Sequence, residues 1–357
     1  MKYEYWFASL KGIPAKDKLK IRQHVFSAKE IYEMDECELE KIGVFEKFRK
    51  IIRAQEAEQS FEAYERMLEK KISFMSMLDV NYPNKLRRIA SPPYALFYKG
   101  SLPDENKKSV AIVGARSCTA YGRQMAEVFS KELAEHGVQI ISGMAMGIDA
   151  AGQKAALDTG GTSFAVLGCG VDICYPREHF SLYQKLEEEG GILSEFPIGT
   201  EPLKQHFPAR NRIISGLSDA VLVMEAKEKS GSLITADMAL EQGKDVYALP
   251  GPLTSALSKG CHELIKQGAG ILISPKELME DLGISPKIIL KKLTENKNVL
   301  ESTENIVYSC LNFQPISPNQ LSVLTKLPIQ TILESLIRLE LKGLVMEVSK
   351  NYYVKVK

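Results

Sequence analysis

Short runs of apolar residues alternate with amphipathic stretches through the middle of the chain. The runs are 110–113, 138–141, 164–167, 220–224, 246–249 and 271–273, and helical patterns such as 125–136 and 235–242 separate them. Fully apolar strands that alternate with helices are typical of a parallel sheet covered on both faces. The sequence therefore predicts a doubly wound α/β domain, of the extended Rossmann-like kind, over residues 76–285.

The first part of the chain has helical periodicity instead. Apolar residues recur at helical spacing in 28–34 and 45–52, and glycine-containing turns at 12–14 and 42–44 separate short helices. We expect a small helical domain over residues 1–75, similar to SAM or helix-hairpin-helix modules. Residues 1–108 hold 21 basic and 17 acidic side chains. Such a module can bind DNA backbones, or it can serve packing or a partner protein.

The last part of the chain predicts a winged helix over residues 301–357, after a polar linker at 286–300. Ser317 and Gln320 form a capping-box pattern with Pro318 at the first helical position. A second helix follows, and Gly343 and a hairpin come after it. The apolar residues that we expect on one face of this helix are Ile329, Ile332, Leu333, Leu336 and Ile337. The outward positions of this helix are Gln330, Thr331, Glu334, Arg338 and Glu340. They are poorly suited to contacting phosphate, which favours a protein-contact role over sequence-specific DNA binding.

Composition places the chain among ordinary globular proteins. Its 357 residues carry a formal net charge of +1, so any nucleic-acid site must be concentrated in one region. There is no signal-peptide pattern and no apolar run of about 18 residues. The six cysteines are scattered and predict no metal site. We expect a cytoplasmic protein with reduced thiols and no membrane contact.

Residues 204–212 stand out against their surroundings. Residues 109–285 hold 15 basic and 22 acidic side chains, yet this stretch, which we expect to be a loop, contains Lys204, His206, Phe207, Arg210 and Arg212 without an acid. Arginine and lysine suit phosphates, and a phenylalanine between them offers a surface for base stacking. The alternative is a solvated loop in which Phe207 is a buried anchor.

Small polar loops follow several of the predicted strands. In a doubly wound sheet these loops meet at one edge, where ligands bind. Glycines allow close backbone approach, and helix starts attract anions. The residues concerned are Gly114, Arg116, Ser117, Gly143, Gly147, Ser230, Gly231, Ser232 and Thr235. Their convergence with 204–212 predicts an anion-binding edge.

Known catalytic patterns are missing from the sequence. The first loop is not G-x-G-x-x-G, and there is no P-loop, no G-x-S-x-G and no H-E-x-x-H. Asp149 and Asp237 could act as catalytic carboxylates, but Asp149 is adequately explained as a helix cap. These observations favour a binding protein without cofactor or metal over an enzyme.

Several motifs occur together in the order of a known family. They are Val113-Gly-Ala-Arg116, 142–149, Tyr175-Pro176, 194–197, 207–214 with 216–218, 230–236, Pro250-Gly251 and Gly260-Cys261. Together they closely resemble the DNA-processing protein A family, also called DprA or Smf. The resemblance is strong over 85–285 and implies a homodimeric protein that binds and protects incoming single-stranded DNA. It also implies loading of the RecA recombinase during natural transformation and homologous recombination.

The resemblance also assigns a binding pocket to particular positions. It comprises the loop at 114–116, Lys204, Phe207 and the run Arg210, Asn211 and Arg212, with 230–235 as its lining. Three positions depart from the family pattern: Met146, the pair Gly152-Gln153, and Ala209 before Arg210. The departures bring into question the part of the second loop in phosphate binding.

One alternative uses the same sheet as a nucleotide-processing or nucleotide-sensing enzyme. Phosphoribohydrolase-type sheets carry a catalytic glutamate after the threonine of a glycine-rich loop. Here Thr235 is followed by Ala236, Asp237 and Met238, without that glutamate. Release of a free base from a nucleoside monophosphate would favour the enzyme.

Overall fold

The computed structural model describes residues 1–54, 57–284, 302–312 and 315–356. The chain divides into two compact units, residues 1–287 and 288–357. The expected linker at 286–300 lies outside the described residues.

Short helices begin the first unit. They are α1 (Lys2–Ser9), α2 (Ala15–His24), α3 (Ala28–Glu33), α4 (Glu36–Lys41), α5 (Glu46–Ala54) and α6 (Ala57–Glu69). Aromatic residues of α1 share a core with Phe97 of the sheet and with Leu186 of the later helix α10 (Phe180–Glu189). Trp6 and Phe7 are fully buried there. The helices thus pack on one end of the sheet, and the boundary at residue 75 stays a prediction.

A nine-stranded sheet forms the centre of the described part of this unit. Its order is β1-β2-β6-β5-β4-β3-β7-β8-β9. The strands are β1 (Ser73–Ser76), β2 (Ala95–Gly100), β3 (Ser109–Val113), β4 (Gln139–Ser142), β5 (Ser163–Val166), β6 (Gly191–Ser194), β7 (Ala220–Val223), β8 (Asp245–Ala248) and β9 (Gly270–Ile271). From β6 to β9 all neighbours are parallel, whereas β1 and β2 pair antiparallel. The predicted doubly wound parallel sheet is confirmed.

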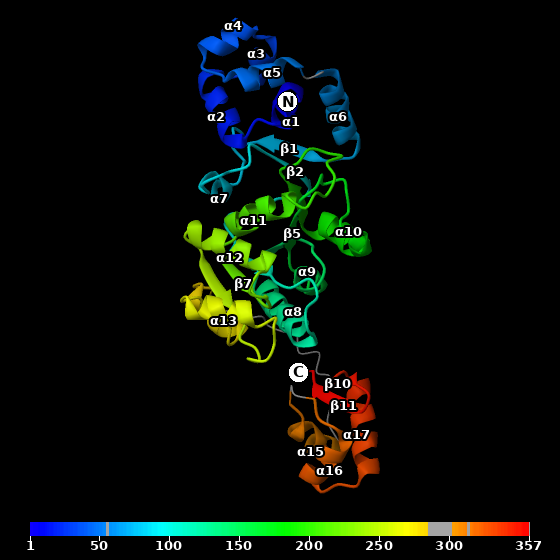
Figure 1. The fold of residues 1–357 in the computed structure, drawn as a ribbon. Helices are drawn as coiled ribbons and strands as arrows, with labels where there is room; N and C mark the ends of the chain where they lie inside the picture. The colour runs from blue at the N-terminus through cyan, green and yellow to red at the C-terminus, as the bar shows by residue number, and fades with distance from the viewer. Residues whose placement is uncertain (55–56, 285–301, 313–314, 357) are drawn as a thin grey trace. The chain divides into compact units, whose positions relative to one another are not determined.

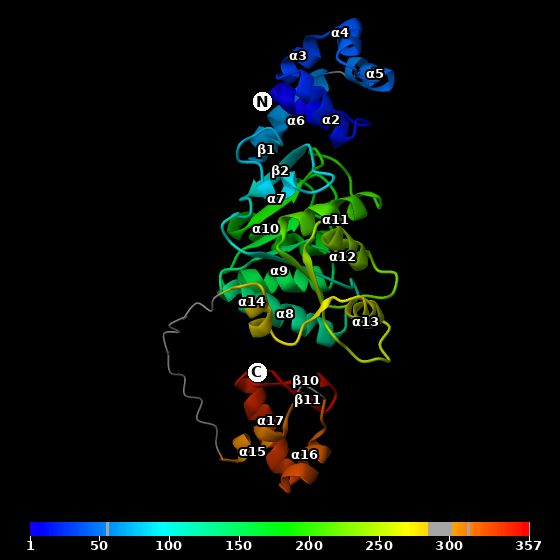
Figure 2. The ribbon, with the colours of Figure 1, turned by 90° about the vertical axis from the view of Figure 1, so that its left-hand side faces the viewer.

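Helices cover both faces of the sheet (Figures 1 and 2). One face carries α7 (Asn84–Arg87), α11 (His206–Leu217), α12 (Gly231–Glu241) and α13 (Lys259–Lys266), which share one apolar core with the strands. The other face carries α8 (Ala120–Glu135), α9 (Ile148–Asp158), α10 (Phe180–Glu189, after the 3-10 turn Arg177–His179) and α14 (Pro275–Asp281). Burial on both faces explains why the central strands contain so few polar residues.

All six predicted strands occur within one or two residues of the expected positions, but β1, β2 and β6 were not predicted. The strands β1 and β6 have four residues each, with serine at three of their four ends and Gly191 at the other. Only two apolar residues lie between these ends, Phe74-Met75 in β1 and Ile192-Leu193 in β6, so the sequence shows no longer apolar run there. Pairing with neighbours, rather than local pattern, determines them.

The second unit has the predicted winged-helix elements. They are α15 (Ser302–Cys310), α16 (Pro318–Thr325), α17 (Ile329–Leu341), β10 (Val345–Ser349) and β11 (Tyr352–Lys355). Ser317 and Gln320 form the predicted capping box. The apolar face expected on α17 is narrower than predicted, because Ile332 and Leu336 are buried while Ile337 is 55% exposed.

No helix in the described ranges is long and apolar enough to cross a membrane. Within the same ranges, no group of three or more His, Cys, Asp or Glu side chains is placed to hold a metal ion.

Candidate nucleic-acid interface

A cavity of about 840 Å³ opens at the carboxyl edge of the sheet. It lies beside the ends of β3 and β7, which are adjacent in the sheet although three parallel strands separate them in sequence. Here the strand order reverses, and such a position is the usual ligand site of an open α/β sheet. Six segments line the cavity: 113–117, Ala145 with Asp149, Tyr175, residues between 202 and 214, residues between 227 and 235, and Leu257.

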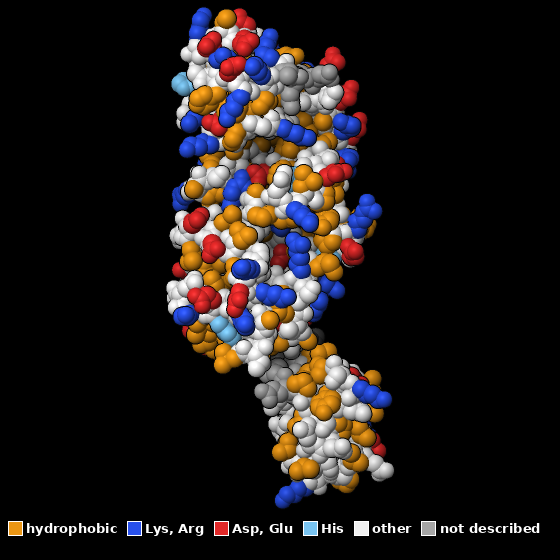
Figure 3. Space-filling model, in the orientation of Figure 1, with side chains coloured by type: hydrophobic (Ala, Val, Ile, Leu, Met, Phe, Trp, Pro, Cys, Tyr) orange, Lys and Arg blue, Asp and Glu red, His pale blue; other side chains and the backbone are white. Residues whose placement is uncertain are grey.

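Four exposed cations surround the cavity: Arg116, Lys204, Lys227 and Lys229. None of the four forms an ion pair with a carboxylate of the described chain. In the space-filling view, Lys and Arg side chains gather around a hollow in the middle of the first unit (Figure 3). Lys227 and Lys229 were not predicted, because Glu225 and Glu228 alternate with them and obscure the local charge.

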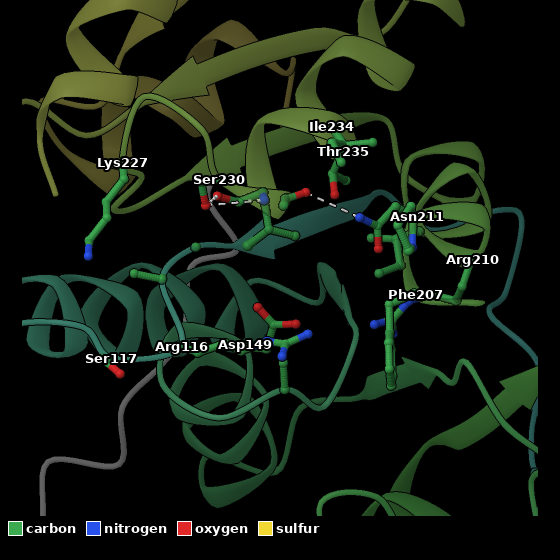
Figure 4. Close-up of a pocket in the computed structure, with 18 of the residues that line it drawn as sticks. Arg116, Ser117, Asp149, Phe207, Arg210, Asn211, Lys227, Ser230, Ile234 and Thr235 are labelled. Carbon is green, nitrogen blue, oxygen red and sulfur yellow. Dashed lines mark hydrogen bonds between the residues drawn. The ribbon is translucent and has the colours of Figure 1, made fainter. Parts of the chain in front are cut away.

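The stretch at 204–212 is mostly a helix, and the expected loop is wrong. Helix α11 begins at His206 and continues to Leu217. Residues 207, 210, 211 and 214 all line the cavity. Their spacing of three, four and seven residues places them on one face of the helix. The pocket wall is therefore a helix face, as the close-up shows for Phe207, Arg210 and Asn211 (Figure 4).

Phe207 is the aromatic centre of this wall. Its ring is partly buried, and the guanidinium carbon of Arg116 lies 5.6 Å from the ring centroid. The ring of Tyr175 lies 5.6 Å away, with the two planes inclined by 30°. The other side of Phe207 packs against Gly168, where an added Cβ would meet ring atom Cδ1 at 2.9 Å. Both predicted roles of Phe207, anchor and stacking surface, fit this geometry.

Arg210 lies at the floor of the cavity and is only 4% exposed. Its Nη1 donates to the carbonyl of Val166, and its charge faces Asp149. Burial lowers the pKa of Arg210 to about 10, an effect that Asp149 partly opposes. Burial likewise raises the pKa of Asp149, while Arg210 and the N–H of Gly143 counteract the shift. Arg210 and Asp149 are therefore two buried opposite charges that stabilise each other electrostatically at the pocket floor.

Asp149 is not the helix cap that we expected. The N-cap of α9 is Gly147, and Asp149 is the second residue of the helix. Its Oδ2 accepts a hydrogen bond from the N–H of Gly143 at 3.1 Å. Asp149 therefore holds the loop after β4 closed and balances the charge of Arg210.

Arg212 points away from the cavity. Its Nη1 and Nη2 donate to both carboxylate oxygens of Glu195 at 2.6 Å, and its Nε donates to the carbonyl of Ser91 at 2.8 Å. Both partners of the ion pair are less than one-fifth exposed. A bidentate pair with a backbone contact is typical of an arginine that fixes structure.

Two of the predicted glycines make room for protein atoms. A Cβ at Gly143 would lie 2.3 Å from Nη1 of Arg210. Gly147 has a positive φ of 81°, and a Cβ there would lie 2.3 Å from the carbonyl oxygen of Ala115. Internal packing is therefore sufficient to require glycine at both positions.

The start of α12 forms a hydroxyl-rich wall of the cavity, with Ser230, Ser232 and Thr235. Ser230 is the N-cap, and its Oγ accepts from the N–H of Ser232. Asn211 of α11 donates to the carbonyl of Gly231 at 3.3 Å, which connects the two neighbouring helices at the cavity (Figure 4). The positive end of the helix dipole at this helix start favours an anion.

Eleven of the fourteen predicted site residues line one cavity: Gly114, Arg116, Ser117, Lys204, Phe207, Arg210, Asn211, Ser230, Gly231, Ser232 and Thr235. Gly143, Gly147 and Arg212 are outside the lining. Met146 and Ala209, two departures from the family pattern, are also outside it. Tyr175, Lys227 and Lys229 are lining residues that sequence reasoning missed.

Sequence comparison identifies the family. The profile of DNA recombination-mediator protein A matches residues 73–283, and that of the DprA winged helix domain matches 291–349. The chain belongs to the DNA recombination-mediator protein A family. Protein Smf of Synechocystis sp. is 33% identical to this DprA-family chain over 96% of each protein.

Two solved structures share the fold. The DNA processing protein A of Streptococcus pneumoniae superposes with a TM-score of 0.65 at 36% identity, covering 79% of this chain and 98% of that one. The DNA processing protein A of Helicobacter pylori superposes with a TM-score of 0.54 at 31% identity, covering 59% and 95%. That second structure is described by its single-stranded DNA binding mode. The predicted resemblance to DprA is confirmed.

Proposed function

We propose that this DprA-family protein binds single-stranded DNA in the cavity at the β3–β7 edge. The observation that carries the proposal is the placement of an aromatic ring among unpaired cations. Phe207 lies under Arg116, and Lys204, Lys227 and Lys229 line the same cavity of about 840 Å³. Aromatic stacking combined with a cationic groove is the usual means of binding single strands without sequence preference. The H. pylori relative supports this ligand.

The shape of the site favours single strands over duplex. A base can enter a concave pocket only if it is unpaired, whereas phosphate contacts alone would not discriminate. Four cations can contact several phosphates of a strand that passes over the cavity. The unit as a whole is not basic, so the strand is held locally.

The lining supports binding rather than catalysis. Among the described lining residues Asp149 is the only acid, and there is no histidine or cysteine. Asp149 is engaged by Gly143 and balanced by Arg210, so it is poorly placed to take a proton from a ligand. We therefore propose a binding protein without catalytic residues.

We further propose that the protein is a cytoplasmic homodimer that loads RecA on the bound strand. The recombinase and the cellular role follow from the family resemblance. Support for a dimer comes from the edge strand β9, where Ile271 is 49% and neighbouring Ile273 69% exposed. Apolar side chains on an open sheet edge favour pairing with another copy.

Competition binding tests the ligand. A labelled single strand is displaced by unlabelled single strand or by duplex of equal length, and we expect the single strand to compete better. Arg116→Ala and Lys204→Ala should each weaken binding and reduce the slope of log affinity against log salt by about 0.7. Lys131→Ala is the matched control, because Lys131 lies exposed on α8, outside the cavity.

Competition by duplex that equals or exceeds that of single strand would refute the proposed ligand. Unchanged salt slopes in both variants would exclude the cavity as the site. RecA filament formation on single-stranded DNA, measured with and without this protein, tests the loading function separately.

A further inference from the structure

Tyr175 has an exposed aromatic ring inside the cavity that the contacts above leave without a role. It lies in the loop between β5 and α10 and is 41% exposed. This loop is held in place, since the hydroxyl of Tyr183 donates to the carbonyl of Val171 and His179 Nδ1 lies 3.0 Å from the carbonyl of Met144. The ring is therefore presented by a fixed segment.

The one ring neighbour of Tyr175 among the described aromatic residues is Phe207. Their centroids lie 5.6 Å apart with planes inclined by 30°, a tilted arrangement. Phe207 has Gly168 and Arg116 around it, whereas no cation lies over Tyr175 in the described chain. Tyr175 thus retains a free aromatic surface beside the ring assigned to the first base.

We propose that Tyr175 forms a second base subsite, so that the cavity takes two adjacent nucleobases of one strand. This inference rests on the proposed function, since it divides the same site into two positions. Successive bases of a single strand stack on one another, and two rings that differ by 30° can both receive them without a sharp bend of the strand. The cavity volume of about 840 Å³ is near the upper end for a site of a single small ligand.

The cations are placed for a ligand of this length. Arg116 and Lys204 lie near Phe207 in space or sequence, and Lys227 and Lys229 extend the cationic rim along the loop before α12. A dinucleotide unit with its flanking phosphates matches this extended rim better than one nucleotide does. The simpler alternative is that Tyr175 only packs against Phe207 and holds that ring in position.

The experiment uses DNA in which most bases are missing. Oligonucleotides of abasic residues carry one thymine, two adjacent thymines, or two thymines separated by several abasic residues. An oligonucleotide with two thymines offers two bases that can enter the cavity instead of one, and comparison with the separated pair corrects for this statistical advantage. We expect the wild-type protein to bind the adjacent pair about tenfold more tightly than the separated pair, which is the effect of one additional stacked base.

Tyr175→Ala should abolish this difference and lower the affinity for the adjacent pair more than the affinity for the single thymine. Tyr175→Phe and Tyr175→Trp should retain the difference, because both keep a flat ring. Phe207→Ala should weaken binding of all three oligonucleotides. Tyr121→Ala is the matched control, since Tyr121 is 42% exposed on α8 and does not line the cavity.

Three results would overturn the second subsite. One is a wild-type protein that binds adjacent and separated pairs equally. Another is a Tyr175→Ala variant that retains the difference, and the third is equal weakening for all oligonucleotides, which indicates a packing role. Failure of the wild-type protein to bind ordinary single strands would instead refute the proposed function itself.

Discussion

Replacing Arg210 by alanine would leave the carboxylate of Asp149 buried without its compensating cation. Arg210 is 4% and Asp149 6% exposed, so solvent screens neither charge effectively. Removing one partner of a buried pair typically costs about 3–5 kcal/mol of unfolding free energy. We therefore expect Arg210→Ala to act mainly on stability, although Arg210 lines the cavity.

The loss of stability should depend on pH, because Asp149 can escape its penalty by taking up a proton. Its pKa is already raised by burial, and the loss of Arg210 raises it further. A carboxyl group with a raised pKa in the folded state stabilises the fold at low pH, and this stability is lost as the pH rises through the folded pKa. Holding the group neutral costs about 1.4 kcal/mol for each pH unit above its unfolded pKa of about 3.9. The loss of unfolding free energy from a neutral Asp149 is thus about 3 kcal/mol at pH 6. At higher pH it rises until it equals the cost of burying the charged carboxylate, and there it levels off.

Urea unfolding of the wild type and Arg210→Ala at about pH 5.5 and about pH 8 measures the effect. We expect the difference in unfolding free energy to be smaller at the lower pH. Adding Asp149→Asn should remove most of the pH dependence and recover part of the stability. Arg123→Ala, an exposed arginine on α8, controls for loss of a positive charge.

One result would refute the reasoning on Arg210. If Arg210→Ala unfolds like the wild type at both pH values but loses single-strand affinity, the guanidinium acts on DNA. The pair would then have no structural role.

Three further changes test the remaining assignments. Arg212→Ala should destabilise the protein by about 2–4 kcal/mol, since it leaves Glu195 poorly solvated. Its single-strand affinity, measured well below the melting temperature, should stay within about threefold of the wild type. A selective loss of affinity would mean that Arg212 contacts DNA. Gly168→Ala should displace the Phe207 ring, since the new Cβ would lie 2.9 Å from it. This variant should have single-strand affinity lowered at least about tenfold. Unchanged affinity in a binding titration would exclude stacking on Phe207. Deleting residues 286–357 should leave most of the single-strand affinity intact, because residues 301–357 are nearly neutral, with 6 basic and 5 acidic side chains. A loss of more than about tenfold in affinity, or about 1.4 kcal/mol, would assign binding to the winged helix.

The sequence predicted the sheet and the edge at which the cavity lies for a clear physical reason. Strands buried on both faces must be apolar throughout, so 110–113 and 220–224 are conspicuous without any alignment. Parallel strands place their following loops at one edge, which brings Arg116 and Ser230 together whatever the details. Fold and approximate site therefore depend on patterns that are local in the sequence.

The roles of individual side chains could not be predicted, because they depend on tertiary contacts. Phe207, in the first turn of α11, packs against Gly168, which is 39 residues earlier in the chain and which no local pattern connects with it. Once the helix is known, its period separates Arg210, at the cavity, from Arg212, at Glu195. In the sequence these two arginines look equivalent.

The cavity is assembled from six segments spread between Val113 and Leu257, so it exists only when this part of the first unit is folded. A ligand that binds there must also stabilise the fold, by about 2.7 kcal/mol at a concentration 100 times its dissociation constant. Local opening of any one of these segments would release the strand, and a bound strand would suppress such opening. Hydrogen exchange in the loops at 114–117 and 227–230 should therefore slow together when DNA binds, although more than 100 residues separate these loops in the chain.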